Sequence, residues 1–205
     1  MGRFTRRWTR VVLVALFEVV ASLGLAIAVY LAHVRASATA LVNSAREIRT
    51  KADAEREIAA WRERSGKDFW EESNHPGGDH NYDAVIGNFA VARLPFVQPT
   101  GVTVGITMRD GQLRCITVVE SAGWHPLASV NIQEWFDEGL PNRFHVGQRG
   151  RPYAATVEFP SSLSDNQRTK AFAVDTNCLV RPRGCTSAED ILPGVWQFES
   201  APNPE

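Results

Sequence analysis

The residues best suited to bind a metal ion lie together in one polar stretch near residue 80. Two histidines and two aspartates fall within nine positions: His75, Asp79, His80 and Asp83. Imidazole and carboxylate groups both bind divalent metals, and the glycines at 77 and 78 give the backbone freedom to bring them together. A polar surface loop explains the same residues, because metal ligands usually project from rigid elements. We therefore expect no metal and no cofactor, and keep these four residues as the candidates if a metal binds.

The three cysteines divide into a candidate pair and a single thiol. Cys178 and Cys185 flank six residues whose Pro182 and Gly184 suit a tight reversal, so an oxidising compartment would join them. Cys115 falls on the expected apolar face of a strand, where a free cysteine behaves as a small buried hydrophobe. We predict a Cys178–Cys185 disulfide and a free Cys115. In a reducing compartment the pair would stay as two thiols.

No short catalytic motif occurs in the sequence. The nucleophile elbow G-x-S-x-G, the zinc motif H-E-x-x-H, the P-loop and the dinucleotide fingerprint are all absent. A hydrolase or metal enzyme would need His75, His80 or His125 to converge with carboxylates. We therefore expect a non-enzymatic protein and assign no catalytic residue.

One segment near the N-terminus is apolar enough to cross a membrane. Residues 11–32 contain a single charge, Glu18, and an α-helix of roughly 20 apolar residues spans a bilayer. Four arginines precede this segment, which predicts a cytoplasmic N-terminus and an extracytoplasmic, periplasmic domain on a cell inner membrane. A cleaved signal peptide is the alternative, but its apolar core is usually only about 7–15 residues.

The acidic residue inside this segment suggests a contact within the membrane. A carboxyl group at mid-membrane costs a few kcal/mol, so such residues usually face a partner or a cavity. Gly24 and Ala28 are small residues spaced four apart, which lets two helices approach closely. We expect Glu18, Gly24 and Ala28 to contact another helix. A protonated Glu18 that faces lipid is the simpler alternative.

Helical periodicity continues beyond the membrane. Apolar residues spaced 4-3-4-3 predict one buried face of a continuing helix: Val34, Ala38, Leu41, Ala45 and Ile48. Thr50 and Asp53 are typical of a helix start, so a second helix is expected over residues 51–64. Its Ala54, Ile58 and Trp61 share one face, which we expect to pack on a domain.

A hairpin is expected where apolar residues alternate around Asp110-Gly111, a pair suited to a type I′ turn. Simple pairing across that turn sets four pairs opposite each other: Met108 and Leu113, Ile106 and Cys115, Val104 and Thr117, and Val102 and Val119. Further strands are expected over 154–159, 171–174 and 195–198, a loop over 71–83 and a short helix over 132–138. Residues 88–94 suit either a helix or a strand. The fold class is α+β, with helices first and a mainly antiparallel sheet after them.

Composition and charge complete the organisation. We divide the chain into a basic N-terminus (1–10), a transmembrane helix (11–32), a juxtamembrane helical region (33–65), an α+β domain (66–199) and a polar tail (200–205). Residues 1–32 carry a net charge of +3 and the rest -4, so the acidic domain offers no footprint for nucleic acid.

This pattern favours a membrane-anchored accessory subunit or scaffold that contacts the bilayer and either a protein partner or a second copy of itself. A small-molecule binding or sensing module is the alternative. It would use a pocket among the aromatic residues between Trp124 and Tyr153.

Overall fold

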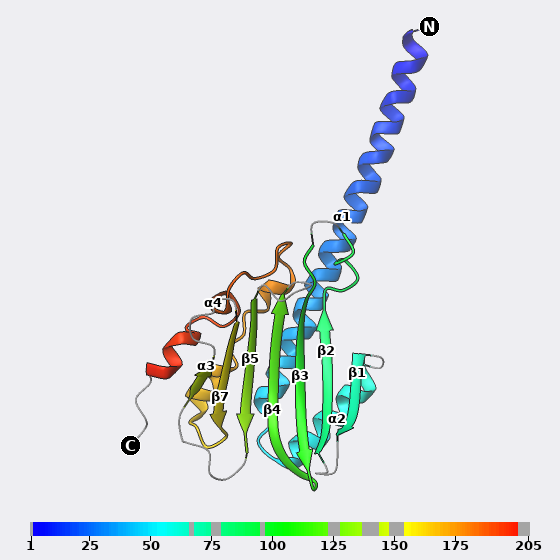
Figure 1. Cartoon of the computed structure of the whole chain (residues 1–205). Helices are drawn as coiled ribbons and strands as arrows, with labels where there is room; N and C mark the ends of the chain where they lie inside the picture. The colour runs from blue at the N-terminus through cyan, green and yellow to red at the C-terminus, as the bar shows by residue number, and fades with distance from the viewer. Residues whose placement is uncertain are drawn as a thin grey trace.

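A single long helix leads into a seven-stranded sheet in the computed structural model. The structure describes residues 2–65, 68–74, 79–94, 97–122, 128–136, 144–147 and 154–200. Helix α1 (Gly2–Glu47) protrudes with its N-terminal half, while its C-terminal half lies along one face of the sheet (Figure 1). Helix α2 (Lys51–Ser65) folds back beside it on that same face. The expected helical start of the chain is confirmed.

The strands are mostly antiparallel, and their order in the sheet is β1-β2-β3-β4-β5-β7-β6. Among the described strands, only β5 and β7 pair in parallel. The strands are β1 (Phe69–Asn74), β2 (Asp79–Gly87), β3 (Thr100–Arg109), β4 (Gln112–Ala122), β5 (Ala128–Trp135), β6 (His145–Gly147) and β7 (Ala154–Pro160). The expected α+β class is therefore confirmed.

The chain reverses between the two helices because Thr50 and Asp53 cap the start of α2. The Asp53 carboxylate accepts hydrogen bonds from the backbone N–H groups of Arg49 (3.2 Å) and Thr50 (3.1 Å). The Thr50 hydroxyl accepts one from the Asp53 N–H (3.2 Å). These bonds satisfy donors that the first turn of a helix leaves free, and they confirm the expected start of the second helix.

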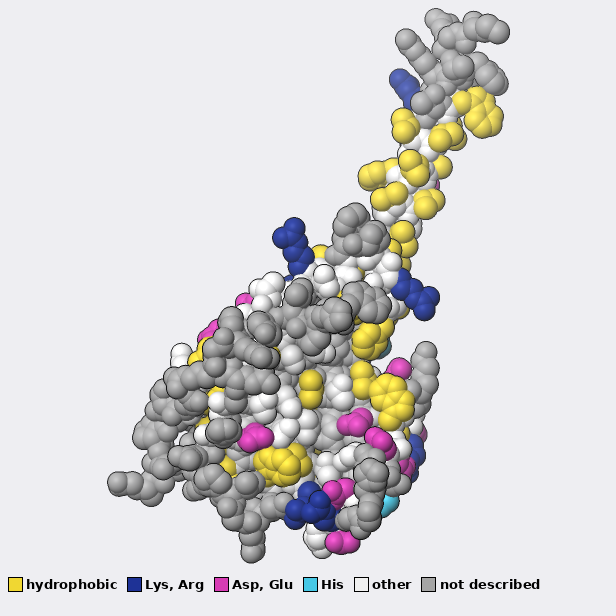
Figure 2. All heavy atoms as spheres, viewed as in Figure 1, with side chains coloured by type: hydrophobic (Ala, Val, Ile, Leu, Met, Phe, Trp, Pro, Cys, Tyr) yellow, Lys and Arg dark blue, Asp and Glu magenta, His cyan; other side chains and the backbone are white. Residues whose placement is uncertain are grey.

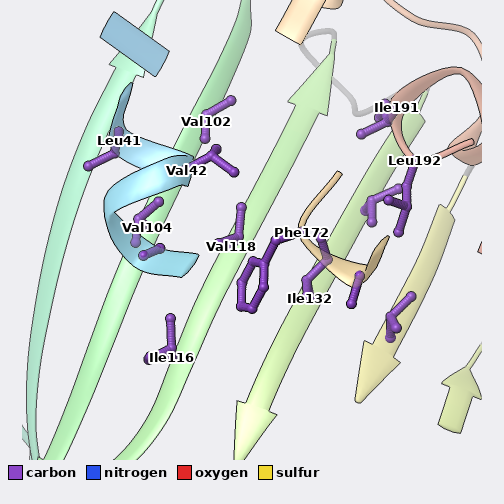
Figure 3. Packing of buried hydrophobic residues seen from close by; sticks show 14 of the residues in the cluster. Leu41, Val42, Val102, Val104, Ile116, Val118, Ile132, Phe172, Ile191 and Leu192 are labelled. Atoms are coloured by element: carbon purple, nitrogen blue, oxygen red, sulfur yellow. The ribbon is translucent and has the colours of Figure 1, made fainter. Parts of the chain in front are cut away.

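The buried face of α1 is the one that its apolar spacing predicts. All five residues of the stripe are 6% exposed or less: Val34, Ala38, Leu41, Ala45 and Ile48. Figure 3 shows Leu41 and its neighbour Val42 beside Val102 and Val104 of β3. The C-terminal half of α1 is therefore an element of the domain core and not a linker.

Short helices cover the rest of this face, where two strands were expected. Residue 171 ends α3 (Asp165–Ala171), which begins at a capping box of Ser164 and Gln167, and residues 172–174 follow it as turn and coil. Residues 195–198 belong to the 3₁₀ helix η3 (Val195–Ser200), and between them lie η2 (Thr176–Leu179) and α4 (Ala188–Ile191). Both strand predictions are wrong, because a short apolar run does not by itself distinguish a strand from a short helix.

The β3–β4 hairpin forms around Asp110 and Gly111, both with positive φ as expected, but its register differs from simple pairing. A bulge between Thr107 and Met108 shifts the ladder by one residue, so that only the pair Met108 and Leu113 is as expected. The observed partners are Thr107 and Cys115, Ile106 and Ile116, Val104 and Val118, and Val102 and Glu120. The shift turns Ile116 and Val118 inward and turns Cys115 to the other face.

Two further predictions, a loop and a short helix, are wrong because both segments form strands with polar residues. Much of the expected loop over 71–83 is strand, in β1 and β2, and the expected helix over 132–138 begins within β5. The described helices lie on one face of the sheet, and alternate positions of these strands carry polar side chains on the other face, called here the uncovered face. Residues 88–94 form turns, neither of the alternatives considered.

Arg168 joins α1 and α3 to the sheet. It is 1% exposed, and its guanidinium donates two hydrogen bonds to the Glu134 carboxylate of β5, both 2.6 Å. The same group donates to the backbone carbonyl of Ile48 (2.8 Å) and to that of Ala45 (3.4 Å). It therefore satisfies carbonyls that the end of α1 would leave unpaired. Burial raises the pKa of Glu134, and the guanidinium opposes that rise.

We expect Arg168→Met to lower the free energy of unfolding by about 3–5 kcal/mol, because it leaves a buried carboxylate and helix carbonyls without their partner. The double variant Glu134→Leu/Arg168→Leu should recover part of this loss. Denaturant titration of the full chain in detergent, followed by tryptophan fluorescence, measures both.

The matched control is Arg49→Ala, which breaks the exposed ion pair with Asp165 at the start of the same helix α3. It should change stability by about 1 kcal/mol or less. Equal losses in Arg49→Ala and Arg168→Met would contradict the role assigned to the buried pair.

Candidate functional site

The protruding half of α1 is apolar on its surface. Within Arg10–Glu47 lies a window of mean hydropathy 2.6, long and apolar enough to cross a membrane, and none of that window is buried against the domain. Phe17, for example, is 72% exposed. Figure 2 shows hydrophobic side chains along the protruding helix. The structure is therefore compatible with a single-pass membrane anchor.

The three residues expected to contact another helix do not share one face of α1. At about 100° per residue, Gly24 and Ala28 lie about 40° apart around the helix, and Glu18 lies roughly 80–120° from them. A Cβ added at Gly24 would meet nothing within 4 Å, so that surface is open. The Gly24 and Ala28 surface lies about 100° around the helix from the buried stripe, while Glu18 lies nearly opposite that stripe.

The metal candidates that the structure describes are not brought together. Alternation along β2 turns Asp79 and Asp83 toward the uncovered face of the sheet and His80 toward the opposite face. Asp79 is paired with Arg109, which lowers the pKa of its carboxyl. Among the described residues no group of three potential metal ligands occurs. His75 and His125 lie outside the described residues.

Cys178 and Cys185 form a disulfide, with Cα atoms 5.1 Å apart, and Cys115 is a buried thiol outside that bond. Gly184 adopts the positive φ (61°) that the reversal requires. The expected pairing is present, while the expected face of Cys115 is wrong because of the β-bulge.

The described rings of the aromatic region pack on one another. Phe144 is buried against Phe159 and Phe198, with ring centroids 5.4 and 4.7 Å apart. Trp135 is partly exposed on the uncovered face of the sheet, opposite Cys115. Trp124, Tyr153 and the tail beyond Ser200 lie outside the described residues.

A groove of about 780 Å³ lies beside α1, at the end of the sheet from which the apolar helix protrudes. One wall is α1 itself, with Tyr30, Ser37 and Ala40. The other walls come from α2, from β2 and from the turns after β2, which contribute Trp61 and Arg93. The sequence did not indicate this groove. Two of its lining residues, Tyr30 and Gly87, are more than fifty positions apart in the chain and meet only in the folded protein.

The groove combines apolar and polar groups. The Tyr30 hydroxyl donates to the Gly87 carbonyl (3.4 Å), which fixes the helix against the end of β2. Trp61 is 1% exposed, and its indole N–H has no acceptor among the described residues. A buried donor without a partner costs about 1–3 kcal/mol, so the groove as it stands leaves one hydrogen bond unmade.

A second unsatisfied group lies in the core. Glu120 is 1% exposed, and neither oxygen of its carboxyl group has a hydrogen-bond partner in the described part of the chain. Burial and the nearby Asp175 raise its pKa to about 8, against the opposing charge of Arg181. The β-bulge places this carboxyl inside, opposite Val102, and so simple alternation missed it.

No protein-family model, curated protein or solved structure matches this chain.

We expect Glu120→Gln to change the pH dependence of stability. Below pH 4.5 the Glu120 carboxyl is protonated in both the folded and the unfolded chain, so its contribution to the free energy of unfolding is fully present. That contribution is lost as the pH rises through 8. The wild type should therefore lose stability relative to Glu120→Gln between pH 4.5 and 8, by at most about 4 kcal/mol. Denaturant titrations at pH 5 and pH 8 measure the difference.

The exposed Glu63→Gln is the control and should keep a constant difference from wild type across this range. If Glu120→Gln behaves like Glu63→Gln, the buried neutral carboxyl is contradicted.

Proposed function

We propose that this protein is a membrane-anchored, non-enzymatic accessory subunit that holds a segment of a partner membrane protein in the groove beside α1. The observation that carries the proposal is the shared wall: the helix that forms one side of the groove is also the apolar helix that leaves the domain. A partner whose own helix crosses the same membrane would enter the groove directly as it leaves the bilayer.

The chemistry of the groove suits a polypeptide. Tyr30 and Ala40 offer apolar contacts, while Arg64 and Arg93 offer donors for backbone carbonyls or acidic side chains. A carbonyl that reached the indole N–H of Trp61, after a small shift of the ring, would supply its missing acceptor. The Gly24 and Ala28 surface of α1 lies on another side of the helix and remains open to a second helix in the membrane.

The proposal includes an orientation. Four arginines before the apolar segment favour a cytoplasmic N-terminus, which places the groove and the disulfide outside the cytoplasm of the cell's inner membrane. The Cys178–Cys185 bond supports this orientation, because disulfides persist in oxidising compartments and are rare in the cytosol.

Thiol counting in cells tests the orientation. After rapid trapping of free thiols in intact cells and denaturation, the chain should show one reactive thiol, Cys115, and three after reduction. A mass-tagging maleimide and gel electrophoresis give the count. Three reactive thiols before reduction would contradict an oxidising location.

Photo-crosslinking tests the groove. A photoreactive amino acid at Ala40, which lines the groove and is exposed, should give one discrete protein adduct in native membranes. The matched control is Ala36, also exposed and on α1 but outside the groove lining, and it should give an adduct at least about tenfold weaker, since crosslinking needs direct contact.

Ser37→Trp, which fills the groove, should abolish the Ala40 adduct without unfolding the chain, because Ser37 is only half-buried. Mass spectrometry then identifies the adduct. Equal adducts at Ala36 and Ala40, or an Ala40 adduct that contains only lipid, would contradict a protein segment in the groove.

A further inference from the structure

We propose that the end of the domain nearest the protruding helix docks on the bilayer and binds anionic lipid headgroups. The surface, here called the membrane-proximal rim, consists of Arg35 on α1, of Phe89, Arg93 and Leu94 after β2, and of Arg183 in the disulfide loop. Phe89 and Arg93 also line the groove. The proposal rests on the membrane anchor, and it is tested with no protein segment in the groove.

The position of the rim follows from the length of the apolar segment. The segment ends at residue 32, and Tyr30 already contacts the Gly87 carbonyl of the domain. Phe89 lies two residues after this contact, and Arg35 lies about 7 Å further along α1 than Tyr30. The headgroup layer of one leaflet is roughly 5–8 Å deep. The rim is therefore at the depth of the headgroups whenever α1 spans the bilayer.

The two loops of the rim are fixed to each other. Asn88 is 1% exposed; its side-chain amide donates to the carbonyls of Gln98 (3.1 Å) and Leu179 (3.2 Å) and accepts from the Thr100 N–H (2.9 Å). The Gln98 N–H donates to the Pro182 carbonyl (2.9 Å). The second loop is also closed by the Cys178–Cys185 disulfide. The rim is therefore presented as one preformed surface, which reduces the entropy lost on binding.

The apolar part of the rim is an exposed aromatic ring, Phe89, that packs on two glycines. Gly87 and Gly101 are paired across β2 and β3, and a Cβ on either would lie only 2.4 or 2.9 Å from the Phe89 ring. The ring therefore rests on bare backbone, yet Phe89 remains 53% exposed, and Leu94 nearby is 42% exposed. Exposed apolar side chains of this kind are stabilised when they insert at the headgroup boundary.

The charged part of the rim is basic. Arg35, Arg93 and Arg183 are exposed, and none forms an ion pair with an acidic residue of the described chain. Asp175, an acidic residue near this end, is already paired with Arg181 (3.5 Å). Figure 2 shows basic side chains on both sides of α1 where it meets the domain, with acidic side chains farther from the protruding helix. This charge is complementary to phosphate headgroups.

The test uses the full chain in lipid nanodiscs, without any protein partner. A fluorophore is attached at Ala90→Cys, within the rim, or at Gln112→Cys, at the far end of the β3–β4 hairpin, both with Cys115→Ser. Quenching by nitroxide-bearing lipids should be strong at position 90 and absent at 112. Quenching at 90 should increase when a third of the phosphatidylcholine is replaced by phosphatidylglycerol.

Arg93→Glu/Arg183→Glu should lower the ratio of docked to undocked domain at least about fivefold in the anionic discs. The control Arg56→Glu/Lys170→Glu reverses two exposed basic residues away from the rim and should leave quenching unchanged. Equal quenching at 90 and 112 overturns the proposal. Quenching at 90 that changes neither with lipid charge nor with the rim variant overturns it as well. Alkaline carbonate extraction separates the two claims: a chain that is extracted overturns the anchor itself, and a retained chain without quenching overturns docking alone.

Discussion

One buried guanidinium holds the long helix α1 to the domain. Arg168 neutralises Glu134 on β5 and at the same time bonds the last carbonyls of α1, so sheet, α3 and long helix meet at a single side chain. A buried charge needs fixed hydrogen-bond partners, and Arg168 has them at Nε and Nη2, whereas Nη1 has no acceptor among the described residues. Its position is therefore specific, and it fixes where α1 ends on the sheet.

The exposed half and the buried half of α1 form one continuous helix, and Arg168 bonds its end to the sheet. The same helix that is apolar and exposed near its start is part of the core near its end, with Ala38 and Ala45 fully buried. Between the two halves the Tyr30 hydroxyl bonds the end of β2. The domain is thus not tethered by a flexible linker, and the groove and the membrane-proximal rim keep a fixed height relative to the anchor. Both proposals of function depend on that height.

The sequence predicted those features that arise from local periodicity and capping. The stripe on α1, the start of α2 at Thr50 and the turn at Asp110-Gly111 were all correct. Strands with polar outer faces were missed, because a sheet covered on one side needs apolar residues at alternate positions only. Short apolar runs near the C-terminus were assigned to strands, although such a run does not by itself distinguish a strand from a short helix.

Most of the candidate site could not be predicted from the sequence. A one-residue bulge shifted the register of β4, so that its side chains exchanged faces and Glu120 became buried. No local sequence pattern predicts such a bulge. The groove and the Arg168–Glu134 pair join residues far apart in the chain, so only the fold reveals them. The disulfide was an exception, because the spacing of its cysteines and the glycine at the reversal are both local.

The most direct test of the account is a distance measurement between the anchor and the sheet in a bilayer. Spin labels at Gly24→Cys and Gln112→Cys, with Cys115→Ser, report whether α1 is one rigid helix from the membrane to the core. Double electron–electron resonance in nanodiscs should give a single narrow distance distribution. A broad or bimodal distribution, as for a domain on a hinge, would contradict the continuous helix on which the account depends.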